Sequence, residues 1–273
     1  MQSGYYSSAA GMVTQFNRLD VIANNLANVN TAGFKQDNIV IGDFMRVFKE
    51  ARDKLPNENN TKEAAQFLNR TITKAPQIVD KFTDHSIGML EKSDNPLDFA
   101  LSKEGMFFLV ETPDGIRLTR DGSFSLDDEG NMITKSGYKV LPNDYFSSKI
   151  PISVNVNDSI MEVDKNGQLY GNTPGTVNLI KGSKFFIAHP DNLALLKKEG
   201  NNLYNYDDIE NLKSVETSAA VKQGFVEKSN VNAIRMMTSM IETNRLVGMY
   251  QKAMQVQMDD MNNDAINKLA STK

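Results

Sequence analysis

Two heptad-patterned stretches, one at each end of the chain, constrain its fold more than any other feature. In the first thirty residues the apolar positions recur at alternating spacings of three and four, through Ala9, Met12, Phe16, Leu19, Ala23 and Leu26. In the last fifty the same alternation runs through Ala233, Met237, Met240, Asn244, Val247, Gln251, Met254, Met258, Met261 and Ala265. This spacing places side chains on one face of a helix. The sequence therefore predicts a helix at each end of the chain.

The ends of these two helices can also be predicted. The first should stop near Asn30, because the residues from there to Gly33 favour turns and Gly accepts a positive φ. The second should begin after a cap at Ser229 or Asn230 and run for about 35 to 40 residues.

The middle of the chain, from about 97 to 215, has no helical period. Asp-Gly and Asn-Gly turns recur about every 8 to 15 residues, as β-hairpins require. The apolar runs between them, at 106–110, 152–156 and 184–188, are typical of strands. We expect an all-β barrel or sandwich here.

The predicted fold class is therefore α+β, with long terminal helices that form a coiled-coil inner domain and flank an all-β domain. We expect the helices at 1–33 and 216–273, an extended arm at 34–96 and the β-rich outer domain at 97–215. Within the arm, short helices are predicted at 44–51 and 61–68.

Composition excludes several kinds of chemistry. The 273 residues include no Cys and two His, and the net charge is −4. Disulfides, thiol nucleophiles and Cys-bound metals are excluded, and no basic excess points to nucleic acid. His85 and His189 are interpreted as surface or turn residues, the acidic turns at 127–131 and 164–168 lack the ligand spacing of a calcium loop, and Lys197 with Lys198 is interpreted as a solvated pair. We expect no enzyme activity, cofactor, metal or small-molecule substrate.

The sequence shows no recognisable signal for secretion or for membrane insertion. The first residues lack the basic start and apolar run of a signal peptide, and no apolar stretch reaches 18 residues. The prediction is a chain with neither a cleaved leader nor a membrane insertion.

The terminal helices need partners, because an isolated amphipathic helix is marginal in water. They could pair as one antiparallel hairpin, form an autonomous dimer, or pack in an array of many chains. The Met-rich and partly polar seam of the second helix, with Asn244 and Gln251, suits an array with several slightly different neighbours.

Four segments in order resemble flagellar rod and hook proteins. Asn-Asn-Leu-Ala-Asn-Val-Asn-Thr-Ala-Gly-Phe-Lys at 24–35 is similar to their N-terminal signature. Asp-Asn-Pro-Leu-Asp-Phe-Ala-Leu at 94–101 resembles the entry to their β-domain, and Leu-Thr-Arg-Asp-Gly-Ser-Phe at 118–124 a segment inside it. Gln-Gly-Phe-Val-Glu-Lys-Ser-Asn-Val-Asn at 223–232 resembles the entry to their C-terminal helix.

This resemblance implies a structural subunit of the bacterial flagellar basal body, which polymerises into a helical tube and transmits torque through the periplasm. It further implies export through the flagellar export apparatus without a cleaved signal peptide. Its partners would be other copies of itself and neighbouring rod proteins.

The position within the rod is less well marked. The segments 4–6, 249–252 and 259–260 favour the proximal-rod subunit, whereas the signature at 24–35 favours the distal-rod subunit. We take the proximal rod as the first expectation and the distal rod as the alternative. In several places, such as Leu118 where the family often has Tyr, the chain departs from the family pattern.

The same resemblance selects the residues expected to act in assembly. Amides at the end of the first helix can both donate and accept hydrogen bonds between subunits, and the residues before the second helix should form its bend and cap. The full set is Asn24, Asn25, Leu26, Asn28, Gly33, Phe34, Gly224, Glu227, Ser229, Asn230, Met237, Asn244, Met254 and Met258. The alternative of another class is a β-rich binding module or enzyme with helical oligomerisation ends.

Overall fold

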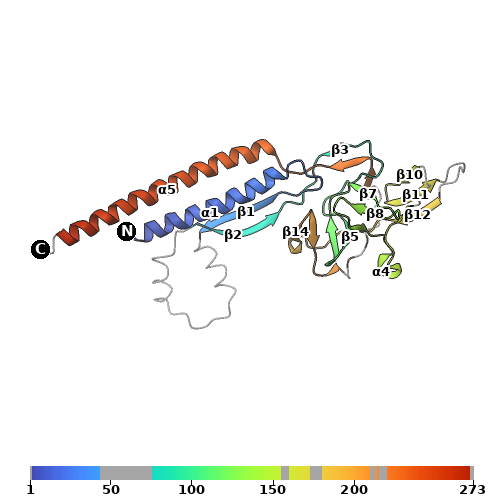
Figure 1. Ribbon diagram of the computed structural model, residues 1–273, viewed down its shortest axis with the longest axis horizontal. Helices are drawn as coiled ribbons and strands as arrows, with labels where there is room; N and C mark the ends of the chain where they lie inside the picture. Colours follow the sequence, from blue (N-terminus) through green and yellow to red (C-terminus); the bar gives the residue numbers. More distant parts are fainter. Residues whose placement is uncertain are drawn as a thin grey trace, which may run out of the picture. The chain divides into compact units, whose positions relative to one another are not determined.

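The computed structural model describes residues 2–43, 76–154, 160–172, 180–209, 212, 214 and 220–270 (Figure 1). The chain divides into two compact units. The first, here called the helical unit, comprises Met1–Ala27, Asp37–Phe82 and Asn232–Lys273. The second, the β-unit, comprises Asn28–Gln36 and Thr83–Val231. The short helices predicted at 44–51 and 61–68 lie outside the described residues.

In the helical unit, α1 (Gln2–Ala27) and α5 (Ala233–Ala270) lie side by side and run antiparallel (Figure 1). Both predicted helices are thus confirmed. A two-stranded ribbon of β1 (Asp37–Asp43) and β2 (Pro76–Thr83) completes the unit. The Thr14 hydroxyl donates to the carbonyl oxygen of Pro76 at 2.8 Å, which joins α1 to the start of β2.

The cap of α5 differs from the predicted one. The side-chain oxygen of Asn232 accepts a hydrogen bond from the backbone N–H of Arg235 at 3.0 Å, as an N-cap does. The predicted caps, Ser229 and Asn230, lie before the helix, and the Asn230 amide bonds elsewhere.

The face of α1 that packs inward is also not the predicted one. Its buried residues include Gly11, Thr14, Gln15, Ile22 and Asn25. The predicted apolar stripe lies beside this face: Met12, Leu19 and Leu26 are half-buried, whereas Phe16 and Ala23 are exposed. Gly4 and Gly11 of α1 lie against Gln257 and Tyr250 of α5, so small residues permit the close approach of the two helices.

On α5 every second position of the predicted stripe faces inward, and the positions between them face outward. Val247 is buried and Met240, Met254 and Met261 are half-buried, whereas Met237, Asn244, Gln251 and Met258 are exposed. The inward column is completed instead by residues such as Met236, Thr243 and Tyr250.

The β-unit is built from short antiparallel strands, as the turn pattern predicted. They are β3 (Leu90–Lys92), β4 (Phe99–Leu101), β5 (Phe107–Thr112), β6 (Gly115–Thr119), β7 (Phe124–Leu126), β8 (Met132–Thr134), β9 (Lys139–Val140), β10 (Ile160–Val163), β11 (Gln168–Asn172), β12 (Ile180–Lys184), β13 (Ile187–Ala188), β14 (Lys197–Gly200), β15 (Leu203–Asn205), β16 (Val221–Gln223) and β17 (Phe225–Glu227), with a short helix α4 (Tyr145–Ser148) and a 3-10 turn η1 (Leu193–Leu195).

The largest sheet has the order β14-β15-β6-β5-β9-β8-β7, and β13 also pairs with β5. The strand β5 lies at its centre and is buried on both faces. Phe108 and Val110 enter one apolar cluster, whereas Phe107 and Leu109 enter another. This alternation follows from the period of two along a strand.

Two predicted strands are shorter than expected. The run 184–188 is divided between β12 and β13, and within 152–154 the structure has a single bridge, from Ser153 to Asn131. The turns at 127–131 and 164–168 join β7 to β8 and β10 to β11 as hairpins, as predicted.

Candidate functional site

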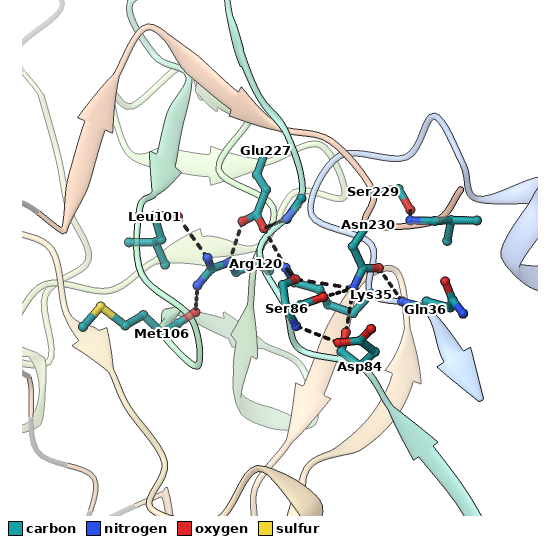
Figure 2. A network of polar contacts seen from close by, with 12 residues as sticks. Lys35, Gln36, Asp84, Ser86, Leu101, Met106, Arg120, Glu227, Ser229 and Asn230 are labelled. Atoms are coloured by element: carbon teal, nitrogen blue, oxygen red, sulfur yellow. Dashed lines mark hydrogen bonds and ion pairs between the residues drawn. The ribbon is translucent and has the colours of Figure 1, made fainter. Parts of the chain in front are cut away.

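Three of the four signature segments meet at one buried carboxylate in the β-unit, that of Glu227 (Figure 2). Its Oε1 accepts from Lys35 Nζ at 2.6 Å and from the backbone N–H of Gly88 at 2.9 Å. Its Oε2 accepts from Arg120 Nε at 2.5 Å. All three charged side chains are at most 2% exposed. The residues come from 24–35, 118–124 and 223–232, so the ion cluster joins segments that are far apart in the sequence.

Backbone carbonyl groups accept further hydrogen bonds from the two cations. Lys35 Nζ donates to the oxygen of Ser86 at 2.6 Å. Arg120 donates from Nη1 to Met106 at 2.5 Å and from Nη2 to Leu101 at 2.9 Å. Buried charges persist only when they are paired and hydrogen-bonded in this way.

The cluster holds two cations and one carboxylate. Burial lowers the pKa of Lys35 below its usual 10.5, and the neighbouring Arg120 lowers it further, whereas Glu227 opposes both effects. Glu227 is therefore the group on which both buried cations depend.

Asn230 makes a second link beside this cluster. Its Nδ2 donates to the carbonyl oxygen of Asp84 at 2.8 Å and to Ser86 Oγ at 3.1 Å, and its Oδ1 accepts from the N–H of Gln36 at 2.8 Å. Asp84 and Gln36 are also joined directly, N–H to carbonyl, at 2.8 Å. We call Lys35, Glu227 and Asn230, with the strand-like segment 84–86 that they hold, the clasp. Next to it, Ser229 Oγ accepts from the N–H of Val231 at 3.2 Å.

Gly33 has the conformation that its turn requires. Its φ is +69°, and its N–H donates to the carbonyl oxygen of Glu227 at 2.8 Å. A Cβ at this position would lie 2.5 Å from the backbone nitrogen of Asp121, so no side chain fits. Gly224, between β16 and β17, donates from its N–H to the carbonyl oxygen of Asp98 at 2.8 Å.

The hairpin of β14 and β15 holds the same turn from its other side. Lys198 Nζ lies 4.4 Å from the centroid of the buried Phe34 ring and donates to the carbonyl oxygen of Lys35 at 2.5 Å. Asn202 Nδ2 donates to the carbonyl oxygen of Ala32 at 2.8 Å. The interpretation of Lys198 as a solvated residue was wrong, and nothing in its local sequence marked the contact.

Sequence reasoning also missed Lys35 and Arg120, although both stand inside the quoted segments. A signal was present for Lys35, which is the single charged residue of the segment 24–35, whereas Arg120 stands next to Asp121 and is not marked in this way. His85 was interpreted as a surface or turn residue, but the structure buries it against the rings of Phe107 and Tyr204, whose centroids lie 5.8 and 5.7 Å from that of its imidazole.

The candidate residues of the helical unit form a separate group. Asn25 is buried, and its amide makes two hydrogen bonds to the backbone of Asp37, with its Nδ2 at 2.7 Å and its Oδ1 at 2.9 Å. Asn24 is exposed and Leu26 is half-buried. Asn28, the first residue of the β-unit, is half-buried, and its side chain accepts from the Thr31 hydroxyl.

Large apolar side chains remain exposed on both helices of the helical unit. Val13 and Phe16 of α1 are 56% and 44% exposed, and Met237 and Ile241 of α5 are 52% and 56% exposed. Met258 further along α5 is similarly exposed. Such rows of apolar residues mark interaction surfaces when they recur along an element.

Among the described residues there is no group of three or more side chains arranged to hold a metal ion. Within the same part of the chain, no helix has both the length and the apolar character needed to cross a membrane.

Comparison with protein families gives three matches along the chain. Residues 6–35 match the model described as flagella basal body rod protein, residues 103–171 the D1 domain of the flagellar hook proteins FlgE/F/G, and residues 222–268 the C-terminal model of the flagellar basal body rod FlgEFG proteins. The first and third ranges contain Lys35 and Glu227, and the second contains Arg120.

Individual relatives cover nearly the whole chain. The flagellar basal-body rod protein FlgG of Buchnera aphidicola (from Schizaphis graminum) is 34% identical over 247 residues, which are 87% of this chain and 89% of the relative. FlgG of Bacillus subtilis is 30% identical over 263 residues, or 90% and 91%. FlgF of Rhizobium meliloti is 27% identical over 251 residues, or 90% and 89%.

Proposed function

Since the chain belongs to the family of flagellar basal-body rod proteins, a structural and non-enzymatic family, we propose that it is a rod subunit of the FlgG type, which polymerises into the distal part of the rod. As a member of this family it is part of the flagellar basal body and assembles with other flagellar proteins.

The position in the rod revises the expectation from the sequence. The short segments at 4–6, 249–252 and 259–260 favoured the proximal rod, but the relatives named FlgG favour the distal rod. The signature at 24–35, which favoured the distal rod, covers more residues than those short segments do.

One observation carries the assembly proposal: α1 and α5 pair through one face each and leave a second, apolar face exposed. Ile241 and Met237 of α5, with Val13 and Phe16 of α1, belong to the second face. In the proposed tube these faces pack against the helices of neighbouring copies, as the coiled-coil inner domain at 1–33 and 216–273.

The candidate residues then divide into two sets. Asn24, Met237, Asn244 and Met258 are exposed and would act between subunits. The residues of the β-unit, such as Gly33, Glu227 and Asn230, would act within the subunit, by fixing the segments that lead out of α1 and into α5.

The remaining features of the proposal follow from the family rather than from contacts. The subunit would leave the cell through the flagellar export apparatus without a cleaved leader and form part of the periplasmic rod. Of the extended arm expected at 34–96, the strands β1, β2 and β3 pair within their own chain, so only residues 44–75 are proposed to act on a neighbouring subunit. The β-rich part at 97–215 would lie outside the helical wall.

Assembly can be tested by placing a charge on the exposed face. Ile241→Glu should leave the folded chain within about 0.5 kcal/mol of the parent, because the side chain is already in water, yet it should abolish rod formation and motility. Isolated basal bodies and swimming assays in a strain lacking this gene give the readout.

Arg235→Gln, which removes one positive charge at an exposed position about 120° around α5 from Ile241, is the matched control and should assemble normally. Normal rods with Ile241→Glu would contradict the proposed face. Electron cryo-microscopy of basal bodies from the parent strain separates the two rod positions, because the chain would be traced in the distal or the proximal segment.

A further inference from the structure

His85 is a buried titratable residue next to the clasp that the ion cluster itself does not use. Its ring is about nine-tenths buried, and its Nδ1 has no hydrogen-bond partner among the described residues. The rings of Phe107 and Tyr204 form its walls. The imidazole is thus held in a largely apolar site that suits its neutral form.

The two residues that flank His85 carry the contacts of the clasp. The carbonyl oxygen of Asp84 accepts from Asn230, and that of Ser86 accepts from Lys35. A displacement of the backbone at His85 would therefore move the acceptors that hold Lys35 and Asn230.

The charges around this ring are mainly positive. Besides burial, which has the largest effect, Lys35, Lys198 and Arg120 each disfavour a proton on the ring, and Asp84 favours one. Glu227 is already shared by Lys35 and Arg120. The Tyr204 side chain is the other titratable group in contact with the ring.

We propose that His85 is an acid-sensitive switch: when its ring gains a proton, the new charge among three cations opens the clasp. The segments around Lys35 and around Asn230 are then no longer joined to each other and to residues 84–86 through the clasp. In acid the β-unit would thus lose these contacts before its β-core unfolds.

The pH range follows from the folded and unfolded states. The unfolded chain protonates His85 below about pH 6.5, whereas burial and the nearby cations lower its pKa in the folded chain to about 4. Between these values the unfolded state binds more protons, so stability falls as the pH falls. The folded-to-unfolded ratio should drop by up to about 300-fold over this range, which is the tenfold-per-pH-unit effect of one proton.

Hydrogen exchange measured on the full-length chain from pH 7 to pH 4 tests the switch. The amides of Gly33, Gln36 and Gly88, which donate within the clasp, should lose protection as the pH falls, ahead of the β5 amides in the core. His85→Phe, which fills the site between Phe107 and Tyr204 without a titrating group, should keep this protection.

His189→Gln is the matched control, because it removes the other His of the chain, and it should behave like the parent. Equal loss of protection in the parent and in His85→Phe would overturn the proposal. If His85→Phe does not fold, NMR titration of the parent's two imidazoles decides: a His85 pKa near 4 supports the switch, and one near 6.5 overturns it. Neither readout depends on assembly, so failure here leaves the rod proposal untouched.

Discussion

The helical unit and the β-unit use charge and apolar surface in opposite ways. The β-unit buries its apolar residues in two clusters around β5 and also buries a three-member ion cluster. The helical unit brings its helices close where Gly11 of α1 lies against Tyr250 of α5, and leaves Phe16 and Ile241 exposed. The β-unit closes its apolar core within one copy, whereas we propose that the exposed apolar residues of the helical unit contact further chains.

Because of this difference, a residue in a family signature can stabilise the subunit itself instead of acting in assembly. The conspicuous residues at 24–35 and 223–232 include ones that act inside the subunit, such as Lys35 and Glu227, which an assembly motif would not require to be buried. The surface that we propose for assembly includes Phe16 and Met237 of the heptad rows and, beside the rows, Val13 and Ile241, none of which lies in those segments.

The largest effect expected from a single substitution is at Glu227. Glu227→Ala leaves Lys35 and Arg120 buried without a carboxylate, and breaking a buried ion pair in this way costs about 3 to 5 kcal/mol. The free energy of unfolding of the β-unit, measured by urea denaturation, should fall by that amount.

Glu91→Ala provides the control for that measurement. Glu91 forms a 3.0 Å pair with Lys228 in which both side chains are about half exposed, so its loss should cost less than about 1 kcal/mol. Equal losses for the two variants would mean that the buried cluster contributes no more than a surface pair, and the contrast between the units would fail.

The next largest effect concerns the turn after α1. Gly33→Ala combines a positive φ with a Cβ that would collide with the backbone of Asp121, so we expect a loss of about 3 kcal/mol or more. Gly137→Ala has a φ of +82° but nothing within 4 Å of the new Cβ, and should cost about 1 kcal/mol. Thermal unfolding of the two variants measures the difference in stability. Similar losses would mean that the contact with Asp121 does not cause the larger effect expected at Gly33.

Much of the fold could be predicted from the sequence because the two periodicities differ so clearly. Heptad spacing predicted α1 and α5, and the Asp-Gly and Asn-Gly turns predicted hairpins such as β5 with β6. Spacing could not predict which face of a helix is buried. Two neighbouring rows of residues on α1 both have heptad spacing, and the buried row contains Gly11 and Gln15, not Phe16.

The candidate site was predictable only in part. The segments were found, but the partners of Lys35, Arg120 and Glu227 lie 107 or 192 positions apart in the chain, and no local pattern encodes such pairings. Lys198 and Asn202 stand in a hairpin with no distinctive sequence, and their contacts with the turn at 32–35 depend on tertiary packing alone.

The smallest expected effect tests whether the helices pair in a single copy at all. Gly248→Ala adds a methyl group where nothing lies within 4 Å, so it should stabilise α5 by about 1 kcal/mol through helix propensity. Gly11→Ala gains the same propensity, but its Cβ would lie 2.5 Å from the Tyr250 ring, so its net effect should be near zero or unfavourable. Circular dichroism melts of the full chain compare the two. If Gly11→Ala stabilises as much as Gly248→Ala, the paired face of α1 is open in the isolated subunit, and both faces of the helix become available to neighbouring copies.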